Sequence, residues 1–354
     1  MSHEEERLAL TETVRSALAK PISGGSPRDV LWTRLAREIG LSALGLPSSC
    51  GGVGGLTEIV LVMEEIGRAL SDVPFLASTV LAAPILAEHA TDHLAKAALN
   101  DVTAGHRSAA VAFDLSGSVV VGPSESDGAR QLSGLVADVV DGMTADVLLV
   151  VGQVAHEDVV LLVEEGGAVR REAVPSFEPG RDLATLILDG VPARQLSLGP
   201  DAQALRLSAL DRAALAHAAE SVGIAAKVLD QTVEYVKQRR QFGRPVGEFQ
   251  AVRHACAEMF IAVETARALV RQVAQAADAG IGIQPLACSS ALHYCSEIAR
   301  SVCSTGIHLH GGIGFTWEYD LHRYFKRASL LRNLPVGVDT HEARIRGALV
   351  GVDQ

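Results

Sequence analysis

Three arginines gather where two long apolar patterns are interrupted. Arg239, Arg240 and Arg244 surround Gly243 and Pro245, and glycine and proline commonly end helices. Each guanidinium group presents a planar set of donors that matches phosphate or carboxylate oxygens. The cluster is therefore a candidate anion site. The alternative is a solvated helix end whose charges face water.

Apolar residues on both sides of this cluster recur every three or four positions, which is typical of amphipathic helices. The stripe before it comprises Leu215, Ala218, Val222, Ala225, Leu229, Val233 and Val236, and the stripe after it comprises Phe249, Val252, Cys256, Met259, Val263, Ala266, Val270, Val273 and Ala277. Two further stripes are Ala291, Tyr294, Ile298, Val302 and Thr305, and then Leu321, Tyr324, Ala328 and Leu331. Short connections between such helices predict an antiparallel bundle.

Three sequence motifs carry a family resemblance. The string R-x-x-F-G-x-P-x-x-x-F-Q runs from Arg239 to Gln250, and I-H-L-H-G-G-I-G-F-T-W-E-Y-D-L-H-R-Y runs from Ile307 to Tyr324. The third, L-G-L-P-S-S-C-G-G-V-G-G, begins at Leu44 and is followed by M-E-E-I-G-R-A-L. In this order they resemble the acyl-CoA dehydrogenase family across nearly the whole chain, and in particular the short subunits of heteromeric bacterial members that lack the catalytic base and act on steroid-type CoA thioesters.

The resemblance and the residue patterns agree on an α+β fold. We expect an N-terminal helical domain at 1–104, a middle antiparallel β domain at 105–200 and a C-terminal four-helix-bundle domain at 201–354. Short β-branched runs bounded by turn residues predict the strands of the middle domain. These runs are Ala109–Phe113, Ser118–Gly122, Asp146–Gly152, Val159–Glu164 and Leu183–Leu188.

The resemblance implies FAD as the cofactor and two segments that contact the flavin of a neighbouring subunit. The corresponding residues are Arg239, Phe242, Gln250, His308, Gly311 and Gly312. Arg239 would pair with the pyrophosphate and Phe242 would pack near the flavin, while the two glycines allow close backbone approach because they have no Cβ. His308 departs from the glutamine of the family, and its imidazole can still donate one hydrogen bond.

Two other family motifs, which hold the flavin within the subunit itself, are missing. The family's T/S-E-P-x-x-G-S loop falls at about Ala112 to Gly117, which reads A-F-D-L-S-G, and its W-x-T/S motif falls at about Val139 to Gly142, which reads V-V-D-G. The chain is therefore expected to complete the flavin site of another subunit and to be poorly equipped to run its own.

The catalytic base is unknown from the sequence. Dehydrogenation needs a carboxylate in contact range of the substrate α proton, and the resemblance places it near Leu334-Pro335-Val336-Gly337 or, in a minority of members, at about Ala213. Neither place holds a glutamate, and the acid nearest to Ala213 is Asp211. Three other glutamates are open alternatives: Glu220, about two helical turns beyond Ala213; Glu318, in a structural motif; and Glu342, in a predicted capping box that begins at Asp339.

Composition excludes several functions. The net charge of −11 argues against nucleic acid or an anionic membrane as a partner, and no apolar run is long enough to span a bilayer. The acidic N-terminus lacks a signal pattern, and five cysteines without ligand spacing favour a reduced cytoplasmic chain with no metal site.

Three functions remain open. The first is an FAD-dependent acyl-CoA dehydrogenase subunit that works with a catalytic partner chain on an acyl-CoA thioester, with electron-transfer flavoprotein as the acceptor that the resemblance implies. The second is a non-catalytic scaffold that binds acyl-CoA or protein. The third is a self-sufficient homo-oligomer with Glu220 as its base. The first and third require a homo- or hetero-oligomer, because the flavin contacts cross a subunit boundary.

Overall fold

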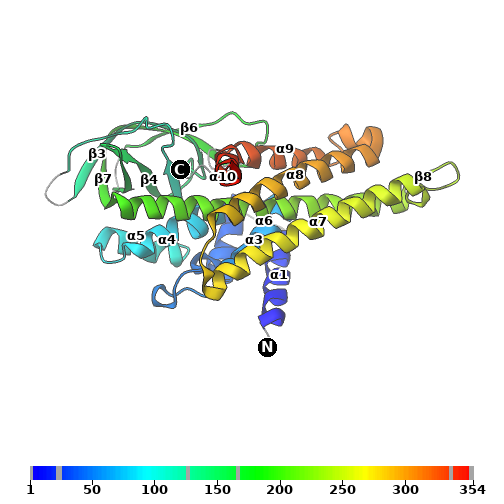
Figure 1. Ribbon diagram of the computed structural model, residues 1–354, viewed down its shortest axis with the longest axis horizontal. Coiled ribbons are helices and arrows are strands. Elements are labelled where there is room, and N and C mark those ends of the chain that lie inside the picture. Colours follow the sequence, from blue (N-terminus) through cyan, green and yellow to red (C-terminus); the bar gives the residue numbers. More distant parts are fainter. Residues whose placement is uncertain (1–2, 21–25, 125–127, 165–167, 335–337, 351–354) are drawn as a thin grey trace. The chain divides into compact units, whose positions relative to one another are not determined.

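The computed structural model describes residues 3–20, 26–124, 128–164, 168–334 and 338–350. The chain divides into two compact units. A helical unit joins Met1–Ala19, Leu56–Ser71 and Ala214–Gln354, and a sheet unit joins Lys20–Gly55 and Asp72–Ala213. One long helix, α6 (Pro200–Gln238), begins in the sheet unit and continues in the helical unit. The predicted order of helices, then sheet, then helices is confirmed (Figure 1).

The helical unit consists of long helices that pack against one another through apolar stripes. Besides α6 it contains α1 (His3–Ala19), α3 (Leu56–Ala69), α7 (Gln250–Ala276), α8 (Pro285–His310), α9 (Leu321–Asn333) and α10 (Val338–Val350). Helix α8 packs against α7, α9 and α10, and α3 packs against α1 and α7. Four residues of the predicted α7 stripe, Met259, Val263, Ala266 and Val270, are buried. Beyond them Ala274 is buried in place of the predicted Val273, which is half-buried.

Helices α3 and α6 cross through two reciprocal glycines. A Cβ built on Gly67 would lie 2.2 Å from the carbonyl oxygen of Glu220, and one built on Gly223 would lie 1.9 Å from the carbonyl oxygen of Glu64. Both distances are far below van der Waals contact, so only glycine fits at either position. The M-E-E-I-G-R segment is therefore fixed to the middle of α6 by backbone-to-backbone packing.

The sheet unit is organised around one seven-stranded sheet. Its strands are β1 (Ala109–Phe113), β2 (Val120–Val121), β3 (Ala129–Val140), β4 (Val147–Val154), β5 (Glu157–Val163), β6 (Arg170–Ala173) and β7 (Leu183–Leu198). The order is β1-β4-β5-β7-β3-β2, with β6 also paired to β7. Helices α2 (Pro27–Thr33), α4 (Ala83–Glu88) and α5 (His93–Thr103) belong to the same unit, with the π-helical turns η1 (Arg34–Glu38) and η4 (Leu76–Ala82).

The sheet differs from the predicted antiparallel domain in one strand pair. Strands β1 and β4 run parallel, with Ala109 opposite Val147, while all other pairs are antiparallel. The sheet is therefore mixed, because β2 and β3 intervene between β1 and β4 in the chain and return it to the same end of the sheet. Strands β3 and β6 lie outside the predicted ranges. Register shifts interrupt β3 near Gly134 and Asp138, so its apolar residues do not form a continuous run.

The three predicted ranges, 1–104, 105–200 and 201–354, separate the chain by element type. The compact units instead group segments by contact, so that α1 and α3 lie with the C-terminal helices. The ranges themselves stay a prediction.

Candidate flavin-completing site

A two-residue hairpin connects α6 to α7. Strands β8 (Arg240–Gln241) and β9 (Arg244–Pro245) pair across Phe242 and Gly243, and the 3-10 turn η5 (Val246–Glu248) leads into α7. Phe242 and Gly243 have φ of 53° and 80°, the two positive values that a type I′ turn requires. The predicted helix break at Gly243 and Pro245 is thus a hairpin, which projects beyond the ends of α6 and α7 (Figure 1).

The hairpin presents Phe242 to solvent at its tip. The side chain is 91% exposed, and a bulky residue with positive φ is a strained exception. Its nearest ring neighbour is Phe249, in a T-shaped contact with centroids 6.1 Å apart, while the Arg244 guanidinium lies 4.1 Å above the Phe249 ring. A strained and exposed aromatic residue at a rigid turn indicates a contact outside this chain.

Arg239 begins the hairpin and is exposed. Its N–H donates to the Tyr235 carbonyl at 2.8 Å, and its carbonyl accepts from the Val246 N–H at 2.7 Å. The backbone is therefore fixed, whereas the guanidinium group has no ion-pair partner within the described ranges. Gln250, the first residue of α7, is also exposed.

The second predicted segment follows the end of α8. His308 is exposed in the last turn, Gly311 ends the helix with φ of 65°, and the 3-10 segment η7 (Gly311–Phe315) continues from it. A Cβ built on Gly311 or Gly312 would meet nothing within 4 Å. The open side of this backbone is therefore free for a close approach by another molecule.

The structure brings the two segments together through one pair of aromatic side chains. The Tyr235 ring stacks on the His310 ring with centroids 4.2 Å apart and planes inclined by 19°. The Tyr235 hydroxyl also donates to the His310 carbonyl at 3.2 Å. Tyr235 precedes Arg239 by four residues and His310 directly precedes Gly311, so this contact joins the ends of α6 and α8.

These residues fit an anionic dinucleotide that is held mainly by another chain. All six predicted positions are exposed, and they combine a cation, an aromatic ring, an amide, an imidazole and two uncovered glycines. Arg239 would hold the pyrophosphate and the glycines would admit it at backbone distance. Ligand sites bury most of the ligand in a cleft. Six exposed residues cannot do so alone, so they could only add contacts to a cofactor site formed mainly by another chain.

The sheet unit does not fit a flavin at the first of the two missing motifs. The Asp114 carboxylate is 8% exposed and accepts from the Ser118 and Val119 N–H groups at 2.9 and 2.8 Å. It also accepts from the hydroxyl groups of Ser116 and Ser118. The loop therefore uses these backbone and hydroxyl donors internally, and they are not free to bind a flavin ring.

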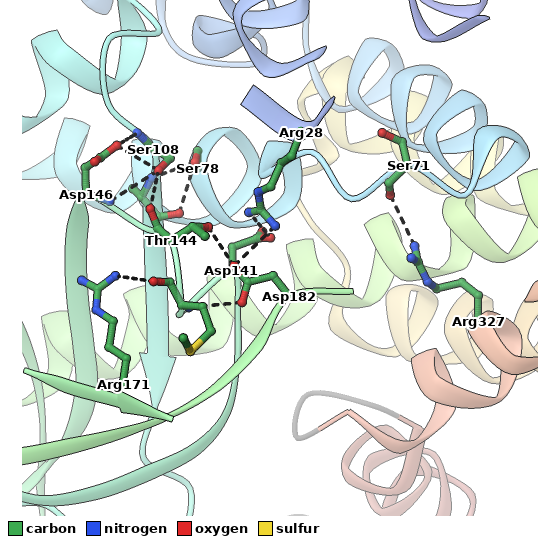
Figure 2. A network of polar contacts seen from close by, with 12 residues as sticks. Arg28, Ser71, Ser78, Ser108, Asp141, Thr144, Asp146, Arg171, Asp182 and Arg327 are labelled. Carbon is green, nitrogen blue, oxygen red and sulfur yellow. Dashed lines mark hydrogen bonds and ion pairs between the residues drawn. The ribbon is translucent and has the colours of Figure 1, made fainter. Parts of the chain in front are cut away.

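At the place of the second missing motif, about Val139 to Gly142, the chain has a buried ion pair. Figure 2 shows Arg28 of α2 reaching Asp141 and Asp182. The Arg28 Nη2 to Asp141 Oδ1 distance is 2.7 Å, and the Arg28 Nη1 to Asp182 Oδ2 distance is 3.4 Å. Burial raises the pKa of Asp141 to about 6, although the charge of Arg28 opposes that shift. The Asp141 backbone is left-handed, with φ of 61°, and the turn that should cradle a flavin is instead tied to α2.

No candidate base lies in a position suited to catalysis among the described residues. Ala213 carries no acid, and Asp211 is buried at 2% exposure. Glu220 has no exposed area and forms an ion pair with Arg327. Glu318 is exposed after η7. Pro335, Val336 and Gly337, the other family position, lie outside the described residues.

Glu342 forms an ion pair with Arg332 at 3.7 Å, and its Oε1 lies 3.1 Å from His293 Nδ1. Helix α10 begins at Val338, so Asp339 lies within it. The Asp339 side chain of the predicted capping box is outside the described part of the chain.

Sequence reasoning missed three aromatic residues at this site. Tyr235 appears in the sequence as one more residue of a helix, and nothing in its spacing points to His310. Phe315 and Trp317 lie between Gly312 and α9 and are 79% and 82% exposed. The exposed Trp317 ring contacts His322, with ring centroids 4.5 Å apart, and the Lys326 ammonium, 4.9 Å from its centroid. For Trp317, the W-E-Y string within the second motif is the sequence signal that could have pointed to a functional aromatic residue.

Comparison with protein families agrees with this geometry. Residues 4–106 match the model of the acyl-CoA dehydrogenase N-terminal domain, and residues 204–335 match that of the acyl-CoA dehydrogenase C-terminal domain. The chain is 34% identical to acyl-CoA dehydrogenase IpdE2 of Mycobacterium tuberculosis, over 93% of this chain and 92% of that protein.

Two solved structures are similar along their whole length. One is a variant of the Tcur3481-Tcur3483 steroid ACAD, with a TM-score of 0.85, 31% identity and 98% coverage of both chains. The other is the ChsE4-ChsE5 complex from Mycobacterium tuberculosis, with a TM-score of 0.84 and 27% identity, covering 99% of this chain and 98% of that one.

The described residues contain no group of three or more histidine, cysteine, aspartate or glutamate side chains placed to hold a metal ion. None of the helices in the described ranges has the length and apolar character needed to cross a membrane.

Proposed function

We propose that this chain, which belongs to the acyl-CoA dehydrogenase family, is the subunit that completes the flavin site of a partner dehydrogenase chain. The family is FAD-dependent. One observation carries the proposal. The six residues expected to face a partner's flavin are exposed at the ends of α6 and α8, while the loop at the place of the family's own flavin motif is closed on Asp114. A subunit with this pair of properties contributes to a site that it does not itself contain.

The roles of its residues follow from their chemistry. When bound, FAD would supply the hydride acceptor for the β carbon of the acyl thioester. Arg239 would place a permanent positive charge beside the pyrophosphate, and its planar donors would bind two oxygens together. Phe242 would pack against the cofactor from the hairpin tip and exclude water there. The uncovered backbone of Gly311 and Gly312 permits contact that a Cβ would prevent.

Removal of the α proton is assigned to a glutamate of the partner. On α6 the glutamate nearest the family position at Ala213 is Glu220, and its carboxylate is held by Arg327 with no exposed area. A base must reach the proton that it removes. This argues against the self-sufficient enzyme with Glu220 as its base.

The substrate proposed is a steroid-type CoA thioester. The support is the 31% identity over nearly the whole chain to a structure described as a steroid ACAD. Electron-transfer flavoprotein as the electron acceptor and a cytoplasmic location complete the proposal, and both rest on family membership.

Co-expression with a dehydrogenase chain that carries the catalytic glutamate tests the proposal. We expect a yellow complex that oxidises an acyl-CoA, and a colourless chain when this subunit is purified alone. Arg239→Ala in the complex should weaken FAD binding by about tenfold to hundredfold, because a charge-assisted contact is lost. Arg239→Lys should restore little, since the planar set of donors is absent.

Arg300→Ala is the control for these variants, because Arg300 is a surface residue of α8 that forms an ion pair with Glu297 of the same helix. A colourless and inactive complex with every tested partner would contradict the proposal and favour the non-catalytic scaffold.

A further inference from the structure

We propose that Tyr235 is the positioning residue that fixes the hairpin and the double-glycine loop relative to each other. The hairpin comprises residues 239–249 and the double-glycine loop residues 311–320. The inference rests on the proposed function, because it concerns how this chain presents both segments to a partner's flavin. Tyr235 itself is assigned no contact with the cofactor.

Both ends of the double-glycine loop rest on the Tyr235 ring. His310, directly before the loop, stacks on it at 4.2 Å. Tyr319, at the far end of the loop, makes T-shaped contacts with Tyr235 and His310, with centroids 5.8 and 5.1 Å apart. Such aromatic contacts are directional, and each is worth more than its buried area alone. A single side chain on α6 therefore sets where the loop begins and where it ends.

The hairpin begins from the same residue. The Tyr235 carbonyl accepts the Arg239 N–H at 2.8 Å, which closes the last turn before the hairpin. The Tyr235 hydroxyl donates to the His310 carbonyl at 3.2 Å. The main chain of Tyr235 thus holds Arg239 while its side chain holds His310.

Close packing around the contact between Tyr235 and His310 restricts the movement of both side chains. A Cβ built on Gly306 would lie 2.7 Å from Val228 Cγ1 and 2.9 Å from Thr232 Oγ1, so α8 passes α6 at close range. His310 Nδ1 lies 2.7 Å from the Gly306 carbonyl oxygen and donates to it, which fixes the imidazole ring. His310 is only 3% exposed. A rigid support of this kind is what a precisely placed binding residue requires.

The first arm of the test uses the chain alone and needs no flavin. Hydrogen–deuterium exchange is measured for the isolated wild type, Tyr235→Leu and Tyr235→Phe. Leucine keeps the bulk but removes the ring, so exchange at residues 239–246 and 308–319 should accelerate by about tenfold or more. Phenylalanine keeps the stack and should preserve most of the protection.

Tyr324→Leu is the matched control. Tyr324 is also a tyrosine of the helical unit with a hydroxyl-to-carbonyl bond, which it donates to Arg68 at 3.0 Å. We expect its loss to leave the protection of residues 239–246 and 308–319 close to that of the wild type. Unchanged exchange in Tyr235→Leu would overturn the inference. Equal acceleration of both segments in Tyr324→Leu would also overturn it.

The second arm measures the FAD dissociation constant of the complex with a glutamate-bearing partner chain. Tyr235→Leu should raise it about tenfold or more, Tyr235→Phe should raise it less, and Tyr324→Leu should leave it within about twofold. If Arg239→Ala weakens FAD binding and Tyr235→Leu does not, the inference is wrong and the proposed function stands. If neither variant weakens it, the proposed function fails and takes the inference with it.

Discussion

The Glu220 carboxylate accepts a 2.9 Å hydrogen bond from Arg327, and neither side chain has any exposed area. Arg327 also donates to the Ser71 carbonyl at 3.4 Å, as Figure 2 shows. The pair joins α6 to α9 and places the end of α3 beside them. Glu220 therefore has a structural role, since a carboxylate held by a buried guanidinium group cannot approach a substrate proton.

Removing one member of this pair should destabilise the chain strongly. Glu220→Gln removes the negative charge that lies 2.9 Å from the buried Arg327 guanidinium group, so the free energy of unfolding should fall by about 3 kcal/mol or more. Turnover of the complex should stay within a few fold. Urea unfolding and acyl-CoA oxidation measure the two effects. The double variant Glu220→Met with Arg327→Met should be less destabilised than the two single changes combined, because no unpaired charge remains.

A catalytic collapse in Glu220→Gln with an unchanged unfolding curve would show that the assignment is wrong. It would restore Glu220 as the base.

Two glycine variants should give opposite patterns of stability and flavin binding. Gly67→Ala places a methyl group against the Glu220 carbonyl, where a Cβ has only 2.2 Å, so the chain should lose several kcal/mol of stability or fail to fold. Gly312→Ala meets nothing within 4 Å and should leave the unfolding curve of the isolated chain unchanged. In the complex the same methyl group should weaken FAD binding, because the proposed function brings the cofactor to the backbone at this position. Unchanged FAD affinity would place the cofactor elsewhere.

Replacing Phe242 should weaken flavin binding by the complex without lowering the stability of the isolated chain. Asparagine tolerates positive φ better than phenylalanine, so Phe242→Asn should keep the thermal midpoint or raise it slightly, by relief of about 1 kcal/mol of strain. The complex should nevertheless lose flavin on dialysis. Differential scanning calorimetry of the isolated chain and flavin absorbance of the complex give the two readings. A variant that is less stable and retains flavin would mean that Phe242 serves the hairpin and not the cofactor.

The helices of the helical unit could be predicted from the sequence, because buried residues recur with the period of the helix. The α9 stripe is buried as predicted, at Leu321, Tyr324, Ala328 and Leu331. The α7 stripe is buried as predicted only from Met259 to Val270, and its two ends are half-buried. The stripe of α8 was partly wrong. Tyr294 and Ile298 are only half-buried, whereas the smaller Cys295, Ala299 and Cys303 are buried. Size misled the prediction, because smaller residues of α8 face its neighbouring helices. The Cys295 thiol, for example, lies 3.8 Å from the Ala266 carbonyl oxygen of α7.

The candidate site was predicted from the resemblance of two motifs to the family, and its residues stay a prediction. Residue type added a physical reason at Arg239, through its charge, and at Gly312, through the missing Cβ. The Glu220 to Arg327 pair joins residues 107 positions apart, and no local pattern announces such a contact. Tyr235 was missed for the same reason, since its partners His310 and Tyr319 lie far away in the chain.

The last helix should make stability depend on pH. His341 is 1% exposed and its Nδ1 lies 2.9 Å from Ser289 Oγ. Burial, with a contribution from the charge of Arg344, lowers the pKa of His341 to about 4. The unfolded chain takes up a proton near the ordinary pKa of about 6.5 while the folded chain does not, so stability should fall as pH drops from about 6.5 to about 4.

The size of this effect is about 3 kcal/mol. Asp141 works in the opposite direction, because its pKa is raised to about 6 and its contribution to stability is lost as pH rises towards that value. The test therefore compares the wild type with His341→Gln in urea at several pH values. The difference between the two should shrink as the pH falls, and a constant difference would exclude a buried neutral imidazole.

The ratio of FAD to protein chains tests the central claim most directly. If this chain completes a partner's site and holds no flavin in its own sheet unit, the purified complex should contain one FAD for each pair of this chain and its partner. The isolated chain should contain none. Two FAD molecules for each pair, or a yellow isolated chain with a reducible flavin spectrum, would contradict the account.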